Sequence, residues 1–283
     1  MKKGILLLLL TLMFSQCFAI QKGIYVTQSS LENTAFITTL IQQAKAAGIN
    51  TFVIDLNRPS ARYRTNIKKV LDAHLKYVVR LVVFPHGGTA AQVRNPAFWQ
   101  RKWPFAEAAI NMGASAVQLD YIRYNTRTPS RASNSHDIEK IIRWYRQRVN
   151  ARGIPLEIDV FGITIFQPSH RIGQNLHVIA DDTDVICPMV YPSHFEPFRK
   201  YSQMPFFTIY NSVKTLKAKF HDKAGFKIIP YIEVSNYRYP MSLTTRLDYI
   251  HKQILGAEKA GADGWYFWSP HNKYGALFTV MRR

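Results

Sequence analysis

Short runs in which apolar and polar residues alternate recur along the chain, and each is followed by a segment of helical periodicity. Residues 116–123 are typical, because Val117 and Leu119 alternate with Gln118 and Asp120. Side chains alternate across a β-strand, so Gln118 and Asp120 share one face and the apolar residues share the other. The pattern predicts a strand that packs its apolar side on helices and carries a carboxylate near its C-terminal end.

The same layout predicts seven further strands, at residues 22–28, 51–57, 77–85, 156–161, 184–191, 227–234 and 264–269. Helical periodicity predicts helices at residues 31–47, 66–73, 95–112, 136–151, 175–181, 205–220 and 243–260, with a last helix at the C-terminal end. Glycine ends three of them, at Gly48, Gly113 and Gly261. Strands that alternate with helices form a parallel sheet.

A single-domain α/β fold, the (β/α)8 TIM barrel, accommodates these elements best. The chain has 283 residues, and such a barrel needs roughly 250. No Gly-x-Gly-x-x-Gly follows the first predicted strand and no phosphate-binding loop is found, which argues against an open dinucleotide-binding sheet.

Residues 1–19 lie outside this pattern and predict an export signal. Lys2 and Lys3 precede an apolar run at residues 4–14, and the end at Ala19 offers small residues at the positions that a cleavage site needs. The run is too short for a membrane span, although an uncleaved anchor or a lipid-modified Cys17 remain alternatives. We therefore expect a barrel of residues 20–283, exported to the periplasm or secreted, with no transmembrane segment and one cysteine, Cys187, as an inert buried thiol.

The formal net charge is +19, which favours anionic partners such as acidic polysaccharide or a phospholipid surface. The basic residues are spread along the chain and no nucleic-acid-binding signature is present, so a nucleic-acid partner is not expected. A generally basic surface with no dedicated partner is the alternative. Three arginines of predicted loops could attract an acidic substrate: Arg127, Arg131 and Arg171.

Four of only 18 acidic residues fall at or near the C-terminal ends of different predicted strands: Asp55, Asp120, Asp159 and Glu233. A carboxylate inside a barrel mouth loses solvation, so it is either paired or functional. Pairing with Arg80, Arg123 or Arg171 would make a purely structural network. Carboxylates together with aromatic side chains are what glycosidic bond cleavage requires, and the strand ends supply Tyr25, Tyr191, Tyr231 and Trp268.

Other chemistries have weaker support. Four histidines lie in predicted loops at the same end of the barrel, but none has the spacing of a zinc motif: His86, His170, His194 and His271. The Gly-x-Ser-x-Gly motif of serine hydrolases is absent. We therefore predict no metal and no cofactor.

Several spaced motifs together resemble a family of bacterial putative glycosyl hydrolases with an α-galactosidase-like (β/α)8 barrel. They lie at residues 23–25, 50–55, 118–123, 159–162, 172–174 and 188–194. The resemblance implies that Asp120 is the nucleophile at the end of the fourth strand, and Asp159 matches a family position that suits the acid/base. Glu233 departs from the family, which tends to an amide there, and residues 123–125 read Arg-Tyr-Asn where the family favours Arg-Phe-Pro.

These observations predict an exported glycoside hydrolase, a monomer, that acts on a polysaccharide or oligosaccharide, with an acidic glycan as one candidate substrate. Asp120 is the predicted nucleophile and Asp159 the general acid/base, with Glu233 in reserve. The predicted substrate-binding residues are Tyr25, Asp55, Arg123, Tyr191, His194, Tyr231 and Trp268. Two alternatives stay open: a non-catalytic glycan-binding barrel, and a basic protein that binds anionic glycan or lipid surfaces.

Overall fold

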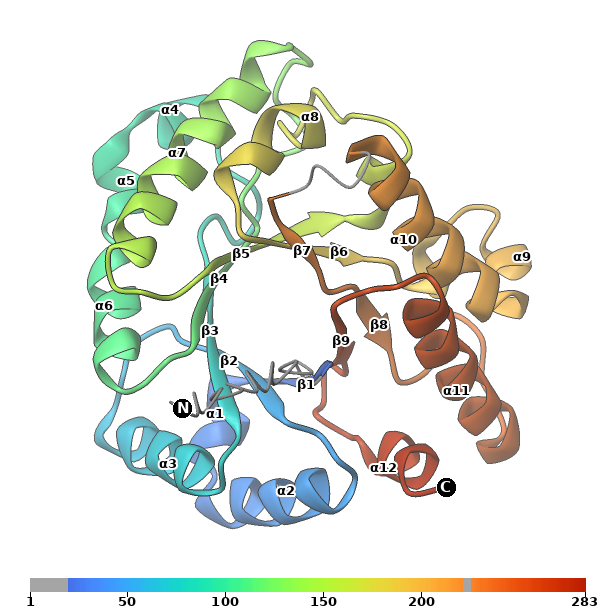
Figure 1. Ribbon diagram of the computed structural model, residues 1–283. Helices are drawn as coiled ribbons and strands as arrows, with labels where there is room; N and C mark the ends of the chain where they lie inside the picture. The colour runs from blue at the N-terminus through green and yellow to red at the C-terminus, as the bar shows by residue number, and fades with distance from the viewer. Residues whose placement is uncertain (1–19, 221–224) are drawn as a thin grey trace, which may run out of the picture.

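A closed parallel barrel forms the centre of the computed structural model, which describes residues 20–220 and 225–283 (Figure 1). The predicted export signal, residues 1–19, lies outside the described residues. The strands are β1 (Gln21–Val26), β2 (Thr51–Asp55), β3 (Lys76–Val82), β4 (Ala116–Asp120), β5 (Leu156–Phe161), β6 (Val185–Met189), β7 (Lys227–Ile228), β8 (Tyr231–Glu233) and β9 (Gly264–Trp268).

The strands pair in chain order, and β1 pairs with both β2 and β9, so the sheet closes on itself. Strand β6 pairs with β5 on one side and with both β7 and β8 on the other. The predicted seventh strand is therefore wrong as one continuous element. It is divided at Ile229 and Pro230, since proline has no N–H for the sheet, and β7 and β8 together fill the seventh position of the (β/α)8 barrel.

At least one helix follows each of the eight strand positions and packs outside the barrel (Figure 1). The α-helices are α1 (Gln28–Glu32), α2 (Thr34–Ala46), α3 (Ala61–Asp72), α4 (Ala90–Arg94), α5 (Pro96–Gln100), α6 (Trp103–Asn111), α7 (Ser133–Asn150), α8 (Leu176–Ile179), α9 (Phe198–Gln203), α10 (Pro205–Phe220), α11 (Leu243–Lys259) and α12 (Gly275–Met281). Short 3-10 helices are η1 (Gly162–Ile165), η2 (Ala180–Asp182) and η3 (Pro192–His194).

Two predicted helices are each divided into two. The helix expected at residues 31–47 is α1 followed by α2, because the Asn33 side chain accepts from the Phe36 N–H and starts a new helix. The helix expected at residues 95–112 is α5 followed by α6, with Pro104 in the first turn of α6. The predicted glycine stops are confirmed, since Gly48, Gly113 and Gly261 all adopt positive φ after a helix.

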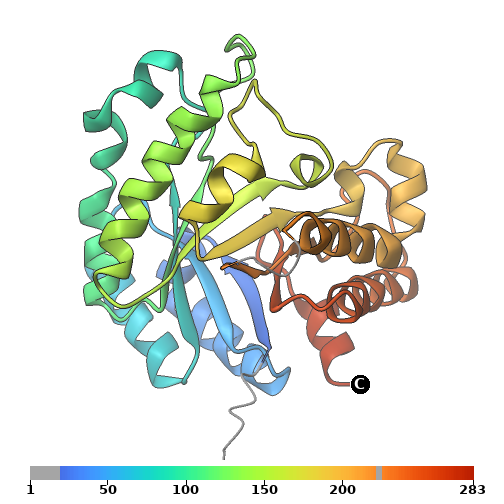
Figure 2. The ribbon, with the colours of Figure 1, turned by 45° about the horizontal axis from the view of Figure 1, so that its top comes forward.

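The main apolar core lies between the barrel and the helices. Helix α7 shows the reason: Ile138, Ile142, Tyr145 and Val149 recur at helical spacing on one buried face. Figure 2 shows α7 against one side of the barrel and the pair α10 and α11 against another. Among the described residues, no helix is both long enough and apolar enough to cross a membrane.

The inside of the barrel is a second, smaller core with polar groups built into it. Tyr25, Val53, Cys187, Tyr231 and Tyr266 belong to it. A glycine makes room for one of these rings, because a Cβ on Gly23 would lie 2.4 Å from Cδ1 of Tyr266. The barrel interior is thus filled by side chains, with one cavity at its C-terminal end and a second pocket at its N-terminal end, where Gln21, Lys76 and Lys227 are among the lining residues.

Candidate active site

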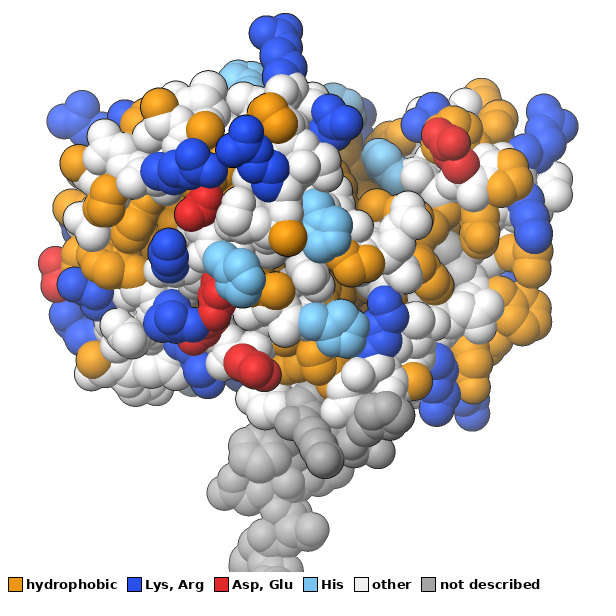
Figure 3. All heavy atoms as spheres, turned by 90° about the horizontal axis from the view of Figure 1, so that it is seen from above, with side chains coloured by type: hydrophobic (Ala, Val, Ile, Leu, Met, Phe, Trp, Pro, Cys, Tyr) orange, Lys and Arg blue, Asp and Glu red, His pale blue; other side chains and the backbone are white. Residues whose placement is uncertain are grey.

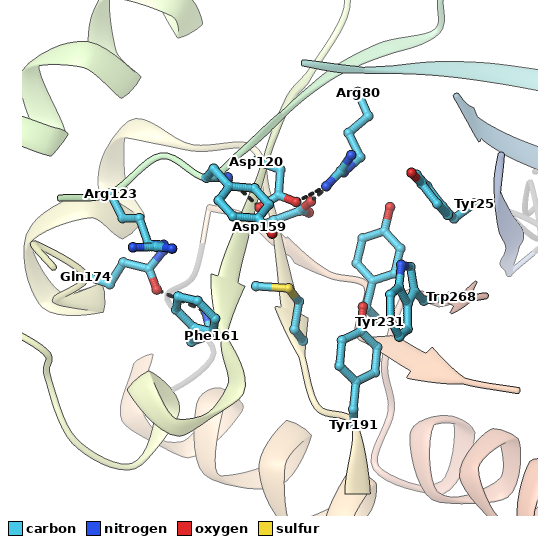
Figure 4. A pocket seen from close by; sticks show the side chains of 12 residues that line it. Tyr25, Arg80, Asp120, Arg123, Asp159, Phe161, Gln174, Tyr191, Tyr231 and Trp268 are labelled. Atoms are coloured by element: carbon cyan, nitrogen blue, oxygen red, sulfur yellow. Dashed lines mark hydrogen bonds and ion pairs between the residues drawn. The ribbon is translucent and has the colours of Figure 1, made fainter. Parts of the chain in front are cut away.

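Three carboxylates from three strands meet around one arginine at the C-terminal end of the barrel. Strand β3 places Arg80 in register with Asp55 on β2, and Asp120 ends the other neighbouring strand, β4. The Arg80 guanidinium donates from Nη1 to Oδ1 of Asp55 at 2.5 Å and from Nη2 to Oδ2 of Asp120. Its Nε lies 3.6 Å from Oδ2 of Asp159, which β5 supplies. The structure thus brings together Asp55, Asp120 and Asp159, as the strand pattern predicts. Figure 4 shows Asp120 and Asp159 beside Arg80.

Hydrogen-bond donors face both oxygens of the Asp120 carboxylate. Oδ2 accepts from Arg80, and Oδ1 accepts from the backbone N–H of Tyr121. Tyr121 has φ of 52°, in the left-handed region that an aromatic residue rarely adopts. Such strain persists where the surrounding structure imposes it, and it is common at functional sites. Here it turns the Tyr121 N–H toward the carboxylate and places the Tyr121 ring beside the cavity.

Asp159 has a different environment and favours its protonated form. The side chain is buried, and within the described residues its Oδ1 has no hydrogen-bond partner. Burial raises the pKa of Asp159 well above its usual range, with Asp120 adding to the rise and Arg80 opposing it. Asp120 and Asp159 therefore lie side by side with opposite tasks available to them: a carboxylate anion and a neutral acid.

Aromatic side chains line the cavity beside these acids. The rings of Tyr191 and Trp268 lie 5.2 Å apart and are tilted by 31°. The Tyr25 hydroxyl donates to Oδ2 of Asp55 at 2.5 Å, and the Tyr231 hydroxyl donates to Gln118 at 2.8 Å. These four aromatic residues, predicted from the strand ends, all line the cavity of about 110 Å³. Figure 4 shows Tyr191, Tyr231, Trp268 and Tyr25 on one side of it.

Glu233 does not reach the cavity. Its carboxylate accepts from the Ser193 N–H at 2.9 Å, from the Ser193 hydroxyl at 2.6 Å and from the Tyr249 hydroxyl at 2.5 Å. Burial raises the pKa of Glu233 to about 7. The Glu233 carboxylate joins the loop after β6 to helix α11, which is a structural position rather than one beside Asp120.

His194 also lies outside the cavity lining. Its side chain is exposed, its Nδ1 is 3.0 Å from the Ser193 hydroxyl, and its ring lies 5.3 Å from that of Tyr191. Partial burial, with the charge of Arg238, lowers the pKa of His194. His194 is therefore in a position to support Tyr191 rather than to contact a bound sugar.

Of the predicted basic residues, one lies at the cavity and three lie away from it. Arg123 lines the cavity, whereas Arg127, Arg131 and Arg171 are exposed on the loops and do not line it. No group of three or more histidine, cysteine, aspartate or glutamate side chains that could hold a metal ion occurs among residues 20–220 and 225–283. Figure 3 shows Lys and Arg side chains scattered over one face of the molecule among few acidic ones.

Four cavity residues were not predicted: Tyr121, Phe161, Gln174 and Met189. Arg80 was considered only as a partner for ion pairs, although a lone arginine in an otherwise apolar strand is itself a signal of a buried charge network. Phe161 and Gln174 are joined, because the Phe161 N–H donates to the Gln174 side-chain oxygen at 2.9 Å. No periodicity in the sequence reveals that contact.

Comparison with known proteins agrees with this architecture. The family model DUF4015, described as a putative glycosyl hydrolase domain, matches residues 87–274, which is more than half of the chain. No curated protein matches the sequence.

Solved structures that resemble the chain are barrel enzymes of low sequence identity, so they inform on the fold alone. The spore cortex-lytic enzyme SleL of Bacillus cereus has a TM-score of 0.66 at 8% identity, over 93% of this chain and 73% of that chain. The endo-beta-1,4-mannanase of Thermotoga petrophila has 0.63 at 12%, over 93% and 75%. A GH18 chitinase of Pseudoalteromonas aurantia has 0.60 at 14%, over 91% and 97%.

Proposed function

We propose a two-carboxylate mechanism for this chain, which belongs to the putative glycosyl hydrolase domain family. Asp120 is the nucleophile and Asp159 the general acid/base. The observation that carries this proposal is the pair of acids on one guanidinium. Arg80 stabilises the charge on Asp120, while burial keeps the proton on Asp159.

The reaction follows from these two states. An oxygen of Asp120 forms a bond to the anomeric carbon as the bond from that carbon to the leaving oxygen breaks, and Asp159 gives its proton to that oxygen. Asp159, now ionised, takes a proton from a water molecule that attacks the same carbon and releases Asp120. Tyr191 and Trp268 offer apolar faces on which a sugar ring can stack.

We propose retention of the anomeric configuration, because both acids lie against one guanidinium. Retaining glycosidases place the two carboxyl groups about 5 Å apart, and inverting ones about 6.5–9.5 Å apart. Asp120 and Asp159 both contact the same side-chain cation, at Nη2 and Nε respectively. A single guanidinium cannot join acids more than about 10 Å apart, the spacing that would favour a non-catalytic glycan-binding barrel.

The experiment is a panel of neutral and acidic polysaccharides, with release of reducing ends measured for the wild type and for Asp120→Asn. Wild-type cleavage that the variant loses is the expected result, and NMR of the first product should show the retained anomer. The matched control is Asp72→Asn, because Asp72 is an exposed acid that pairs only with Lys68 on α3. Cleavage by Asp120→Asn at the wild-type rate would refute the assignment.

Export is part of the same proposal. The sequence of residues 1–19 supports it, with two lysines before an apolar run and a small residue at Ala19. N-terminal sequencing of the protein from the periplasm or medium should begin at Ile20. A cytoplasmic protein that still starts at Met1 would contradict the prediction.

A further inference from the structure

Arg123 is a cation at the cavity that forms no ion pair with an acid in the described part of the chain. The Arg123 side chain lines the cavity and is half-buried. Figure 4 shows it across the cavity from Trp268, with Asp120 and Asp159 between them. Among the described residues no carboxylate forms an ion pair with Arg123, whereas Arg80 contacts three.

The surroundings of Arg123 fix its position without neutralising its charge. The guanidinium carbon lies 5.4 Å from the ring centroid of Tyr121 and 5.4 Å from that of Phe161. Nη1 donates to the backbone oxygen of Tyr124 at 3.0 Å, and Nε is buried with no partner among the described residues. Burial lowers the pKa of Arg123, against the opposing effects of Tyr121 and Asp120. The charged guanidinium of Arg123 is thus partly removed from water, although no carboxylate of the described residues pairs with it.

A structural role accounts for only part of this arrangement. Elsewhere in the chain Arg148 stacks on Trp144 at 3.7 Å and donates to the Trp144 backbone oxygen, yet Arg148 remains exposed on α7. Packing on a ring and bonding a carbonyl therefore do not require desolvation. Arg123 makes similar contacts at the wall of a cavity that also holds the catalytic acids.

We propose that Arg123 binds a carboxylate on the substrate, so that the hydrolase acts on glycans with carboxylated sugars. This rests on the proposed function for the substrate, but the binding step can be measured without catalysis. A guanidinium presents its N–H groups in one plane, which matches the planar carboxylate better than it matches a tetrahedral anion. The rings of Tyr121 and Phe161, each 37% exposed, offer apolar surface to the sugar that carries the carboxylate.

The two acids do not repel such a substrate as strongly as their number suggests. Asp159 favours its neutral form, and Arg80 lies against both Asp55 and Asp120. Arg80 offsets one of those two carboxylate charges and Arg123 offsets the other, so the cavity has no net negative charge.

The test is ligand-observed NMR titration of the full protein at low salt. The probes are glucuronate and galacturonate, which carry the carboxylate on the ring, and N-acetylmuramate, which carries it on a lactyl ether. Glucose, galactose and N-acetylglucosamine are their neutral counterparts, and acetate, phosphate and sulfate are the bare anions. We expect at least one carboxylated sugar to bind about tenfold or more tightly than its counterpart, because hydrogen bonds between charged groups contribute that much.

Three variants separate recognition from general charge and from folding. Arg123→Gln should bind carboxylated and neutral sugars equally, and Arg123→Lys should keep only part of the preference because the planar fork is lost. The control Arg148→Gln removes the same charge and a similar ring contact on α7 and should keep the full preference. Thermal melting of each variant shows that it is folded.

Each outcome decides one of the two proposals. Equal binding of carboxylated and neutral sugars by the wild type, or an equal loss of preference in Arg148→Gln, would overturn the role of Arg123. Tighter binding of phosphate or sulfate than of every carboxylated sugar would also overturn it. If carboxylated sugars bind through Arg123 but the wild type cleaves no glycan, the proposed hydrolase function fails and the recognition site stands.

Discussion

Replacing Glu157 by glutamine should remove one of the contributions that make the stability of the barrel depend on pH. Glu157 lies on β5 inside the barrel, fully buried, two residues before Asp159. Its carboxylate accepts from the Gln118 amide at 2.9 Å and from the Tyr266 hydroxyl at 3.0 Å. Glutamine has the same shape and carries no charge, so its amide oxygen still accepts from Gln118 and Tyr266.

The magnitude follows from the pKa of Glu157, which burial raises from 4.5 to about 7. Below pH 4.5 Glu157 holds its proton in both the folded and the unfolded chain, so it costs the wild type no stability. As the pH rises from 4.5 to about 7, the unfolded chain releases the proton before the folded chain does, so stability is lost. The free energy of unfolding that Glu157 costs is about 3 kcal/mol at pH values above the upper pKa and about 1 kcal/mol at pH 5.

Thermal unfolding at pH 5 and at pH 8 measures this effect. Relative to the wild type, Glu157→Gln should gain about 2 kcal/mol more at pH 8 than at pH 5, which raises the melting temperature by several degrees. Any repacking cost of the substitution is the same at both pH values and cancels in that comparison. The control Glu258→Gln changes an exposed carboxyl on α11. An advantage of Glu157→Gln that is equal at pH 5 and pH 8 would refute the reasoning.

Three other predictions concern the cavity and the barrel. Asp159→Asn should lower kcat by about 10²–10⁴-fold and remove the loss of activity that the wild type shows as the pH rises through the raised pKa of Asp159; a pH–rate profile with an unchanged alkaline limb would contradict this. Trp268→Ala should raise KM by about tenfold with kcat nearly unchanged, because a stacking surface holds substrate and transition state alike. Steady-state kinetics measure both constants, and a fall in kcat with KM unchanged would contradict this prediction. Gly23→Ala should destabilise the protein by about 1–3 kcal/mol through overpacking, since its Cβ would lie 2.4 Å from the Tyr266 ring, whereas Gly275→Ala has no atom within 4 Å and is the control in thermal melting.

The sequence predicted the barrel and most of the cavity because both depend on strand alternation. Asp120 lies at the C-terminal end of β4 and Asp159 near that of the neighbouring β5. Parallel strands bring these ends to one edge, so closure of the barrel places the acids together. The aromatic residues Tyr25, Tyr231 and Trp268 follow from the same rule. These predictions needed only the period of the pattern and the direction of the strands.

Glu233 shows where alternation is insufficient. The pattern placed Tyr231 and Glu233 on one face, and both are buried, but only Tyr231 lines the cavity. The direction of the Glu233 carboxylate depends on Ser193, from the loop after β6, and on Tyr249 from α11. Tyr249 and Ser193 lie 16 and 40 residues from Glu233 along the chain. The alternation of residues within one strand cannot predict such contacts. The backbone strain at Tyr121 is likewise set by its surroundings.

The assignment of roles to Asp120 and Asp159 depends finally on how charge is distributed along β5. Glu157 and Asp159 share the inner face of that strand, and burial raises the pKa of both carboxyl groups. One guanidinium, Arg80, faces three carboxyl groups and contacts Asp159 at the longest distance, 3.6 Å. Burial therefore favours the protonated forms of the acids of β5, while Asp120 has a donor on each oxygen. This order, an anion on β4 beside a neutral acid on β5, is the one that attack on the anomeric carbon and protonation of the leaving oxygen require.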